Sequence, residues 1–183
     1  KNKCTVWFST PSLLIYFINF DLLDKKKFKS IKKIIFGGEG FPKAKLETLF
    51  KKLKNKNFYN VYGPTECTCI CSRYLISEKD FNKNNYSSKN IYVPIGSIAE
   101  NFDYKIVDNK LRRVKKGKVG ELILYGPNIA YGYIGDKENT NKNFIFDIDN
   151  LDSQRAYKTG DLVKEGKLNN QLFFIGRNDT QIK

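Results

Sequence analysis

The sequence has no histidine, no methionine and only four cysteines. Without histidine or a C-x-x-C pair, it lacks the usual ligand set of a zinc site. The cysteines do not make a disulfide scaffold, and we expect them to be small buried hydrophobic residues in a reduced cytoplasm. Cys67, Cys69 and Cys71 alternate, so on a strand they would share one face. Because residue 1 is lysine and methionine is absent, we expect the chain to be a fragment of a longer protein.

Long hydrophobic runs are also absent. The apolar run at residues 13–18 is bounded by Asn19 and Asp21, and it falls well short of the roughly 18 apolar residues that a membrane span needs. No secretory signal is visible. We therefore expect a cytoplasmic protein that has no membrane partner.

Positive charge dominates the chain, with a formal net charge of +14. Lysine supplies most of it and is scattered along the whole length, with the densest clusters at residues 25–27, 51–52 and 115–116. We interpret this pattern as a solvated basic surface, without a nucleic-acid partner. The alternative of another class is a basic module that binds nucleic acid or an acidic partner.

The first half of the chain alternates apolar runs with helical patterns. Strands are predicted over residues 3–9, 31–36 and 58–62, and helices from Pro11 to about Phe20 and from Pro42 through Leu53. Short links between such units indicate a parallel sheet. Residues 67–76 are predicted to be extended, and residues 77–90 to form a loop or domain joint.

The second half has shorter runs separated by turn signals. Strands are predicted over residues 103–107, 119–125, 162–164 and 172–175, and helical turns over residues 130–133 and 138–143. This pattern favours an antiparallel, barrel-like unit. The predicted fold is therefore α/β: part of a parallel α/β sheet subdomain over residues 1–90, then a smaller antiparallel β subdomain over residues 91–178.

The stretch from Asn60 to Glu66 carries the strongest chemical signal. Its sequence, Asn-Val-Tyr-Gly-Pro-Thr-Glu, includes the end of a predicted strand. The Gly63-Pro64 pair turns the chain sharply, Thr65 can donate to an anionic oxygen, and Glu66 can hold a hard cation such as magnesium. At the carboxyl end of a strand in an open α/β sheet, this pattern indicates a magnesium–nucleotide site. The alternative is an ordinary strand-to-loop turn.

Further motifs cover nearly the whole chain in a fixed order. They are Ile35-Phe36-Gly37-Gly38-Glu39 upstream, and Gly120-Glu121-Leu122, Gly126-Pro127, Gly132-Tyr133, residues 157–162 and residues 176–183 downstream. With residues 60–66, this ordered set resembles the adenylate-forming enzymes, the superfamily of amino-acid adenylation domains, acyl-CoA synthetases and luciferases. Residues 6–12 and the pattern Asp179-x-Gln181-x-Lys183 are most similar to amino-acid-activating members, and D-alanine–carrier protein ligases are the nearest subgroup.

The resemblance implies that ATP or AMP and Mg²⁺ are the cofactors. The expected nucleotide-binding residues are Gly38, Glu39, Asn60, Tyr62, Gly63, Thr65, Asp161 and Arg177. Among them, Tyr62 would stack on adenine with Asn60 near the adenine amino group, and Asp161 would accept from the ribose hydroxyls. Thr65 at the α-phosphate and Glu66 as the magnesium ligand are the expected catalytic residues.

Taken one at a time, these residues leave plainer alternatives open. Tyr62 could be a packed core aromatic, Asp161 a turn cap, and Arg177 a surface arginine rather than a rigid fork for ribose or phosphate. The Gly37-Gly38 pair could be a strand-to-loop bend. The family context favours the functional alternative in each case.

The side-chain pocket of the amino-acid substrate is expected from the same resemblance. Its predicted lining residues are Ile35, Gly37, Val61, Cys69 and Ile70. None is charged, so we expect a small or medium uncharged amino acid, because a charged side chain would be buried without a partner. D-alanine ligases have a cysteine at the Gly37 position that narrows the pocket, so glycine predicts more room. The alternative is that these residues are core.

We therefore predict the central fragment of an ATP-dependent, AMP-forming ligase. It would make an aminoacyl-adenylate for transfer to the phosphopantetheine thiol of a carrier protein. An acyl- or aryl-CoA ligase of the same superfamily is the alternative. In the family, Asp179 marks the hinge to a C-terminal lid, so residues 179–183 are the expected hinge. The family's phosphate loop, lid lysine and amino-group-binding aspartate have no match in this chain, and we expect the chain alone to be inactive.

Overall fold

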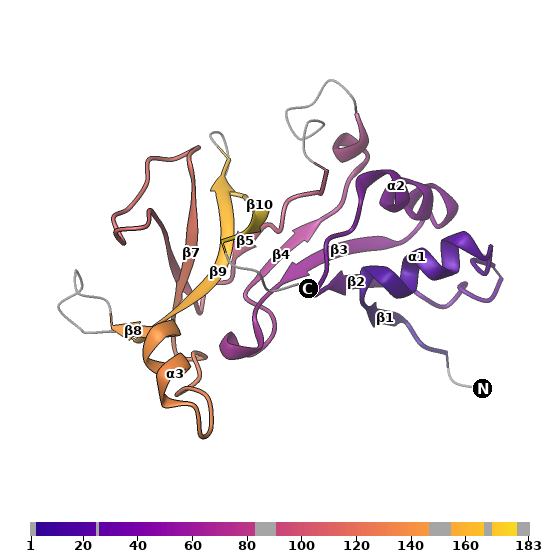
Figure 1. Cartoon of the computed structure of the whole chain (residues 1–183). Coiled ribbons are helices and arrows are strands. Elements are labelled where there is room, and N and C mark those ends of the chain that lie inside the picture. The colour runs from indigo at the N-terminus through magenta and orange to yellow at the C-terminus, as the bar shows by residue number, and fades with distance from the viewer. Residues whose placement is uncertain (1–2, 25, 83–90, 147–154, 167–169, 179–183) are drawn as a thin grey trace.

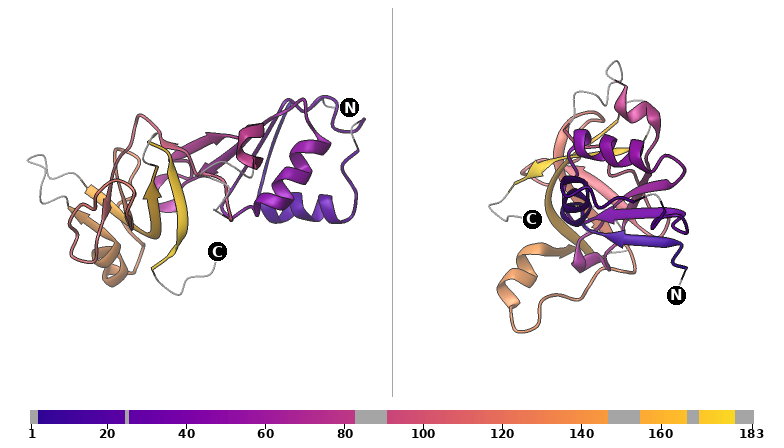
Figure 2. Two further views of the ribbon diagram at one scale, coloured as in Figure 1. Left: turned by 90° about the horizontal axis from the view of Figure 1, so that it is seen from above. Right: turned by 90° about the vertical axis from the view of Figure 1, so that its right-hand side faces the viewer.

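A computed structural model describes residues 3–24, 26–82, 91–146, 155–166 and 170–178 of the chain. These residues form two five-stranded sheets that follow one another along the sequence, here called sheet A and sheet B. The molecule is elongated, with sheet A and its helices at one end and sheet B at the other (Figures 1 and 2). The α/β fold with a second, antiparallel β part confirms the predicted class.

Sheet A has a parallel core with two antiparallel strands added at one edge. In spatial order its strands are β1 (Val6–Ser9), β2 (Lys33–Gly37), β3 (Asn57–Tyr62), β4 (Ser72–Leu75) and β5 (Ser97–Ile98). β1, β2 and β3 are parallel to one another, as predicted, whereas β4 and β5 are each antiparallel to the strand before them. The carboxyl ends of the parallel strands β2 and β3 therefore lie at the same edge of the sheet.

Two helices cover one face of sheet A. They are α1 (Pro11–Asn19), which begins with a proline in its first turn, and α2 (Lys43–Lys52). Leu14 of α1 and Leu46 of α2 are buried in one core with Ile34 and Phe58 of the sheet. Each of these four side chains is almost completely removed from water, which favours folding by about 1.5–3 kcal/mol apiece.

Sheet B is antiparallel, and in the described residues the first and last strands of its spatial order are not paired with each other. Its strands are β6 (Asp103–Val107), β7 (Val119–Tyr125), β8 (Phe144–Phe146), β9 (Arg155–Glu165) and β10 (Leu172–Arg177), and the short helix α3 (Lys137–Asn143) precedes β8. The spatial order is β10-β9-β7-β6, with β8 also paired to β9. β9 is much longer than the three-residue strand predicted over residues 162–164, because its polar first half pairs with β7 and β8.

Four local predictions differ from the structure. Residues 67–76 are not extended throughout: a 3-10 helix, η1 (Thr65–Cys67), is followed by Thr68 and Cys69 with φ angles of 61° and 72° before β4 begins. Cys67 and Cys71 are buried as expected, but Cys69 and Cys4 are exposed. The predicted helical turn at residues 130–133 is irregular backbone, and a second 3-10 helix, η2 (Glu78–Phe81), lies in the predicted loop.

Backbone hydrogen bonds join the two sheets. The Ile95 N–H donates to the Leu172 carbonyl oxygen at 2.8 Å, and the Leu172 N–H donates back to Gly96 at 2.8 Å. A second apolar core crosses the same joint, since it combines Tyr62, Cys67 and Cys71 with side chains of sheet B. β5 of sheet A lies beyond residue 90, where the sequence placed the subdomain boundary. In the described part of the chain, no helix is long and apolar enough to cross a membrane.

Candidate functional site

A cavity of about 440 Å³ opens where the two sheets meet. From sheet A it is lined by residues after β2, at the end of β3 and in η1: Gly38, Glu39, Asn60, Val61, Tyr62, Gly63, Thr65 and Glu66. From sheet B it is lined by Tyr157, Thr159, Asp161, Phe174 and Arg177. The cavity therefore lies at the carboxyl ends of parallel strands, the edge at which α/β sheets bind their ligands.

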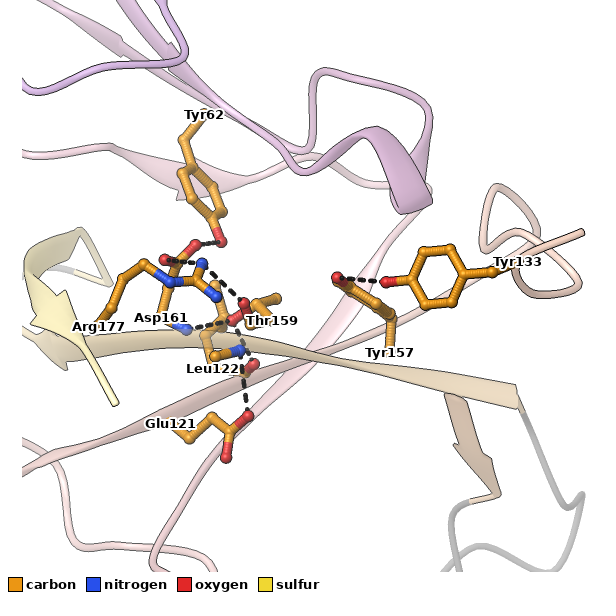
Figure 3. A network of polar contacts seen from close by, with 9 residues as sticks. Tyr62, Glu121, Leu122, Tyr133, Tyr157, Thr159, Asp161 and Arg177 are labelled. Atoms are coloured by element: carbon orange, nitrogen blue, oxygen red, sulfur yellow. Dashed lines mark hydrogen bonds and ion pairs between the residues drawn. The ribbon is translucent and has the colours of Figure 1, made fainter. Parts of the chain in front are cut away.

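Asp161 is the most deeply buried charge in this cavity, with 1% of its surface exposed. Its Oδ2 accepts a hydrogen bond of 2.6 Å from the Tyr62 hydroxyl, and its Oδ1 lies 2.9 Å from the Arg177 guanidinium (Figure 3). Tyr62 comes from β3, 99 residues earlier, whereas Arg177 is the register partner of Asp161 on β10. The carboxylate thus has a partner on each side of the joint.

The backbone around Gly160 fixes the direction of the Asp161 side chain. Gly160 has a φ of 68°, a left-handed conformation that favours glycine, and its N–H donates to the Glu121 carboxylate at 3.1 Å. The buried Thr159 hydroxyl donates to the Leu122 carbonyl oxygen at 2.8 Å and accepts from the Asp161 N–H at 3.0 Å. These bonds, drawn in Figure 3, hold the bend of β9 in one geometry.

The electrostatics keep Tyr62 neutral. Burial, and then the negative charge of Asp161, raise the pKa of Tyr62 well above its ordinary value. The Tyr62 hydroxyl is therefore protonated at neutral pH and donates its hydrogen bond to Asp161.

Glu66 also lines the cavity, and it lies in η1. Its Oε1 accepts a hydrogen bond of 2.7 Å from the Tyr133 hydroxyl, and its carbonyl oxygen accepts from the Ala130 N–H at 2.8 Å. Burial alone would raise the pKa of the Glu66 carboxyl, but hydrogen bonds, first that from Tyr133, and the Arg177 charge hold the net pKa below its ordinary value. Glu66 is therefore a carboxylate at neutral pH.

A second cavity, of about 490 Å³, adjoins the first. Four residues line both cavities: Glu66, Tyr157, Thr159 and Arg177. Tyr133 lines only the second cavity. Glu66 is consequently shared by the two cavities.

Glu66 fits a magnesium ion that is held mainly by its substrate. In the part of the chain that the structure describes, no group of three or more His, Cys, Asp or Glu side chains is arranged to hold a metal. Magnesium is commonly bound by one or two carboxylates together with substrate phosphates and water. One ionised carboxylate at the edge of a nucleotide-sized cavity matches that pattern.

The other predicted nucleotide-binding residues also lie at the cavity. Asn60 is buried and its amide donates to the Pro94 carbonyl oxygen at 2.8 Å. The Glu39 carboxylate accepts from the backbone N–H and the hydroxyl of Ser12, each at 3.0 Å, at the start of α1. Gly63 leaves no room for a side chain, since a Cβ there would lie 2.2 Å from the Cys69 carbonyl oxygen.

The five predicted pocket residues do not all line the cavity, although Gly37 is the register partner of Val61 on the adjacent strand. Val61 lines the first cavity, but Ile35, Gly37, Cys69 and Ile70 do not. Ile35 pairs in register with the exposed Phe8, on the face of sheet A opposite the buried Ile34. The left-handed turn after η1 leaves Cys69 and Ile70 exposed.

Gly37 is explained by close strand packing. A Cβ at this position would lie 2.4 Å from the Val61 carbonyl oxygen on the adjacent β3. Glycine therefore permits the approach of β3 to the end of β2. The predicted hinge residue, Asp179, lies outside the described residues.

Several cavity residues were not in the predicted site. They are Phe41, Tyr92, Val93, Ile95, Tyr157, Thr159 and Phe174, and the Glu66 partner Tyr133 belongs with them. Tyr133, Tyr157 and Thr159 lie within quoted motifs, so the signal was present but no role was assigned. The others come from a loop after β2, from the stretch before β5 and from β10, and only the fold places them together.

A buried carboxylate clamped between two strands beside a polar cavity defines a small-molecule site of an α/β enzyme. A family model described as AMP-binding enzyme matches residues 1–134. The chain belongs to this family, which confirms the resemblance drawn from its motifs.

Two sequence relatives illustrate the range of this family. The chain is 32% identical to the D-alanine–D-alanyl carrier protein ligase of Bacillus velezensis over 189 residues, which cover 100% of the chain and 34% of the relative. It is 32% identical to aldehyde reductase lnaA of Aspergillus flavus over 158 residues, covering 86% of the chain and 14% of that protein. The chain thus spans about a third of the length of the ligase.

Solved structures share the fold. PA1221, an NRPS protein containing adenylation and PCP domains, superposes with a TM-score of 0.82 at 23% identity, over 97% of this chain and 34% of that one. The Vibrio cholerae adenylation domain AlmE, solved in complex with glycyl-adenosine-5'-phosphate, gives a TM-score of 0.78 at 25% identity, over 99% of this chain and 32% of that one.

Proposed function

We propose that this chain is the central part of an AMP-forming, amino-acid-activating ligase. In the reaction, an oxygen of the substrate carboxylate attacks the α-phosphorus of ATP. The bond to the bridging oxygen breaks, and the products are aminoacyl-adenylate and pyrophosphate. The observation that carries the proposal is the buried Asp161 carboxylate, held between Tyr62 and Arg177 in a cavity that also contains Thr65 and Glu66.

Each end of the cavity suits one part of an adenylate. Asp161 offers a fixed acceptor for ribose hydroxyls, and Arg177 beside it offers a planar donor for ribose or phosphate oxygens. Tyr62 and Asn60 at the end of β3 supply an aromatic ring and an amide for the adenine. Thr65 and Glu66 in η1 would take the α-phosphate and its magnesium, whose role is to neutralise phosphate charge. Positioning and charge stabilisation are what such a reaction requires of the protein.

The proposed substrate is a small or medium uncharged amino acid. Val61 is the predicted pocket residue that lines the cavity, and it is apolar. The similarity to a D-alanine–D-alanyl carrier protein ligase supports an amino acid and a carrier protein with a phosphopantetheine thiol as the partners. A cytoplasmic location agrees with the four free thiols. We also propose that residues 179–183 are the hinge to a lid.

Pyrophosphate exchange into ATP tests this proposal on the full-length protein that carries the chain. We expect exchange that depends on an uncharged amino acid, little exchange with lysine, arginine, aspartate or glutamate, and none from residues 1–183 alone. Val61→Ala should shift the preference toward larger side chains, by roughly tenfold or more per methylene. Val61 is chosen over Gly37 because a Cβ at residue 37 would lie 2.4 Å from the Val61 carbonyl oxygen of β3. Absence of exchange with every amino acid would contradict the proposal, and release of pyrophosphate only with a fatty or aryl acid would favour the acyl-CoA ligase.

A further inference from the structure

The segment that joins β7 to α3 reaches across the joint and contacts the Glu66 loop at three places. The Tyr133 hydroxyl donates to Glu66 Oε1 at 2.7 Å, and the Ala130 N–H donates to the Glu66 carbonyl oxygen at 2.8 Å. The Thr68 hydroxyl donates to the Asn128 carbonyl oxygen at 3.0 Å. Sheet B thereby fixes both the backbone and the side chain of a residue that belongs to sheet A.

Tyr133 is itself held from two directions. Its N–H donates to the Thr140 hydroxyl of α3 at 2.8 Å, and its ring meets that of Phe144 edge-to-face at a centroid distance of 5.4 Å. The hydroxyls of Tyr133 and Tyr157 lie 3.4 Å apart and face each other in Figure 3. The hydroxyl that reaches Glu66 is therefore on a ring with little freedom to move.

The backbone on the amino side of Tyr133 is fixed as well. The Arg155 guanidinium of β9 donates to the Ala130 carbonyl oxygen at 3.1 Å and to the Tyr131 carbonyl oxygen. Gly132, with a φ of 147°, has no space for a Cβ, which would lie 2.4 Å from a methyl group of Thr140.

We propose that Tyr133 is a positioning residue that holds the Glu66 carboxylate in the orientation in which it binds the magnesium ion of the nucleotide. This inference rests on the proposed function. Tyr133 lines the second cavity but not the first, whereas Glu66 lines both, and the Tyr133 hydroxyl bonds to one oxygen of the Glu66 carboxylate, Oε1. A carboxylate that accepts a hydrogen bond at one oxygen can use the other for a metal, and such outer partners orient the ligand and raise metal affinity.

Tyr133→Phe separates this role from packing. The variant keeps the ring and its contact with Phe144 and removes only the hydroxyl. Tyr104→Phe is a matched control, because the Tyr104 hydroxyl also donates to a glutamate, Glu165 Oε1 at 3.3 Å, elsewhere in sheet B. The measurement is calorimetric titration of the full-length protein that carries the chain with ATP, once with magnesium and once with EDTA. The ratio of the two affinities is the magnesium enhancement, a quantity that a purely structural role would not change.

In Tyr133→Phe we expect the magnesium enhancement to fall about tenfold, the lower end of the usual effect of losing an outer partner of a metal ligand. The affinity measured in EDTA should not change, and Tyr104→Phe should behave as the parent chain. Thr140→Val, which removes the acceptor of the Tyr133 N–H, should change the enhancement in the same direction by less. This second variant decides the question if Tyr133→Phe does not fold.

Two results would overturn the inference. One is a Tyr133→Phe chain with the enhancement of the parent, and the other is equal loss of affinity with magnesium and with EDTA. Glu66→Gln distinguishes this failure from failure of the proposed function. If the parent binds ATP with an enhancement that Glu66→Gln abolishes and Tyr133→Phe leaves intact, the metal assignment stands and only the positioning role is lost. If the parent shows no enhancement, the metal assignment itself fails, and the role of Tyr133 fails with it.

Discussion

At the scale of single residues, Asp161 combines a structural ion pair with the proposed contact to the ribose. Its ion pair with Arg177 is almost removed from water, with side-chain exposures of 1% for Asp161 and 13% for Arg177. Both charged groups lose their hydration on folding. Removing one of them leaves the other buried without a partner, which is strongly destabilising. Replacing Asp161 should therefore reduce the stability of the fold as well as nucleotide binding.

Asp161→Asn is expected to lower the free energy of unfolding by about 3 kcal/mol, since it leaves the buried Arg177 charge unpaired. AMP affinity should fall by about tenfold or more, because the Asn amide replaces one of the accepting carboxylate oxygens with an NH2 group that can only donate. Urea denaturation and calorimetric titration with AMP measure the two effects. Asp103→Asn, an exposed position at the start of β6, is the control and should change neither. Unchanged AMP affinity in folded Asp161→Asn would remove Asp161 from the ribose site.

The raised pKa of the buried Tyr62 hydroxyl should make the fold less stable at alkaline pH. The folded state raises its pKa, whereas in the unfolded chain the phenol ionises near pH 10. Its stabilising contribution is therefore complete below about pH 10 and is lost as the pH rises toward the higher pKa of the folded state. In Tyr62→Phe the free energy of unfolding should fall less steeply above pH 10, by up to about 1.4 kcal/mol per pH unit. Parallel curves for parent and variant, from urea titrations at several alkaline pH values, would contradict this.

The motifs indicated which residues might form the site but not how those residues contact one another. Asp161, Arg177 and Tyr62 were predicted as nucleotide-binding residues, and the structure brings all three together at one cavity. Their mutual hydrogen bonds could not be predicted, because Tyr62 and Asp161 are 99 residues apart and meet only through packing of the two sheets. Tyr133 was missed for the same reason.

At the scale of elements, the loop between β3 and β4 determines where Thr65 and Glu66 lie. The Gly-Pro turn was predicted, but the path after it was not. The sequence there alternates small residues in a way that suits a strand, whereas the chain forms η1 and then two consecutive left-handed residues, Thr68 and Cys69. A left-handed conformation is strained for residues other than glycine, so contacts with other parts of the structure must offset its cost. The bond from Thr68 to Asn128 of sheet B helps to hold this conformation.

Gly63→Ala should disrupt this loop. A Cβ at residue 63 would lie 2.2 Å from the Cys69 carbonyl oxygen, and backbone atoms cannot move aside cheaply. We expect a loss of unfolding free energy of about 3 kcal/mol, near the upper end of the usual cost of overpacking. Gly176→Ala is the control: a Cβ there meets nothing within 4 Å, so its effect should stay within about 0.5 kcal/mol. Equal urea midpoints for the two variants would show that the loop is not packed as described.

The regular elements were predictable because their patterns were strong. α1 and α2 and the parallel strands β1 to β3 follow from apolar periodicity and short links, and β6 and β7 were predicted with the bounds observed. The polar first half of β9 was not predicted. It carries Tyr157, Thr159 and Asp161, which line the cavity, and its pairing depends on β7 and β8.

At the scale of the whole molecule, the site exists only because the two sheets are joined. Sheet A supplies Tyr62, Thr65 and Glu66, and sheet B supplies Asp161 and Arg177. The joint has its own backbone bonds and a shared apolar core, so the cavity is a built part of the fold. A nucleotide bound there would contact both sheets and should stabilise the whole chain by mass action.

A crystal structure of the chain with AMP and magnesium tests this account most directly. The account predicts that the ribose hydroxyls contact the Asp161 carboxylate, that the adenine lies beside Tyr62 and Asn60, and that the phosphate lies next to Thr65 and Glu66. Asp161→Asn crystals grown in the same conditions should show weak nucleotide density or none. Nucleotide bound away from this cavity, or bound within it with the ribose far from Asp161, would contradict the account.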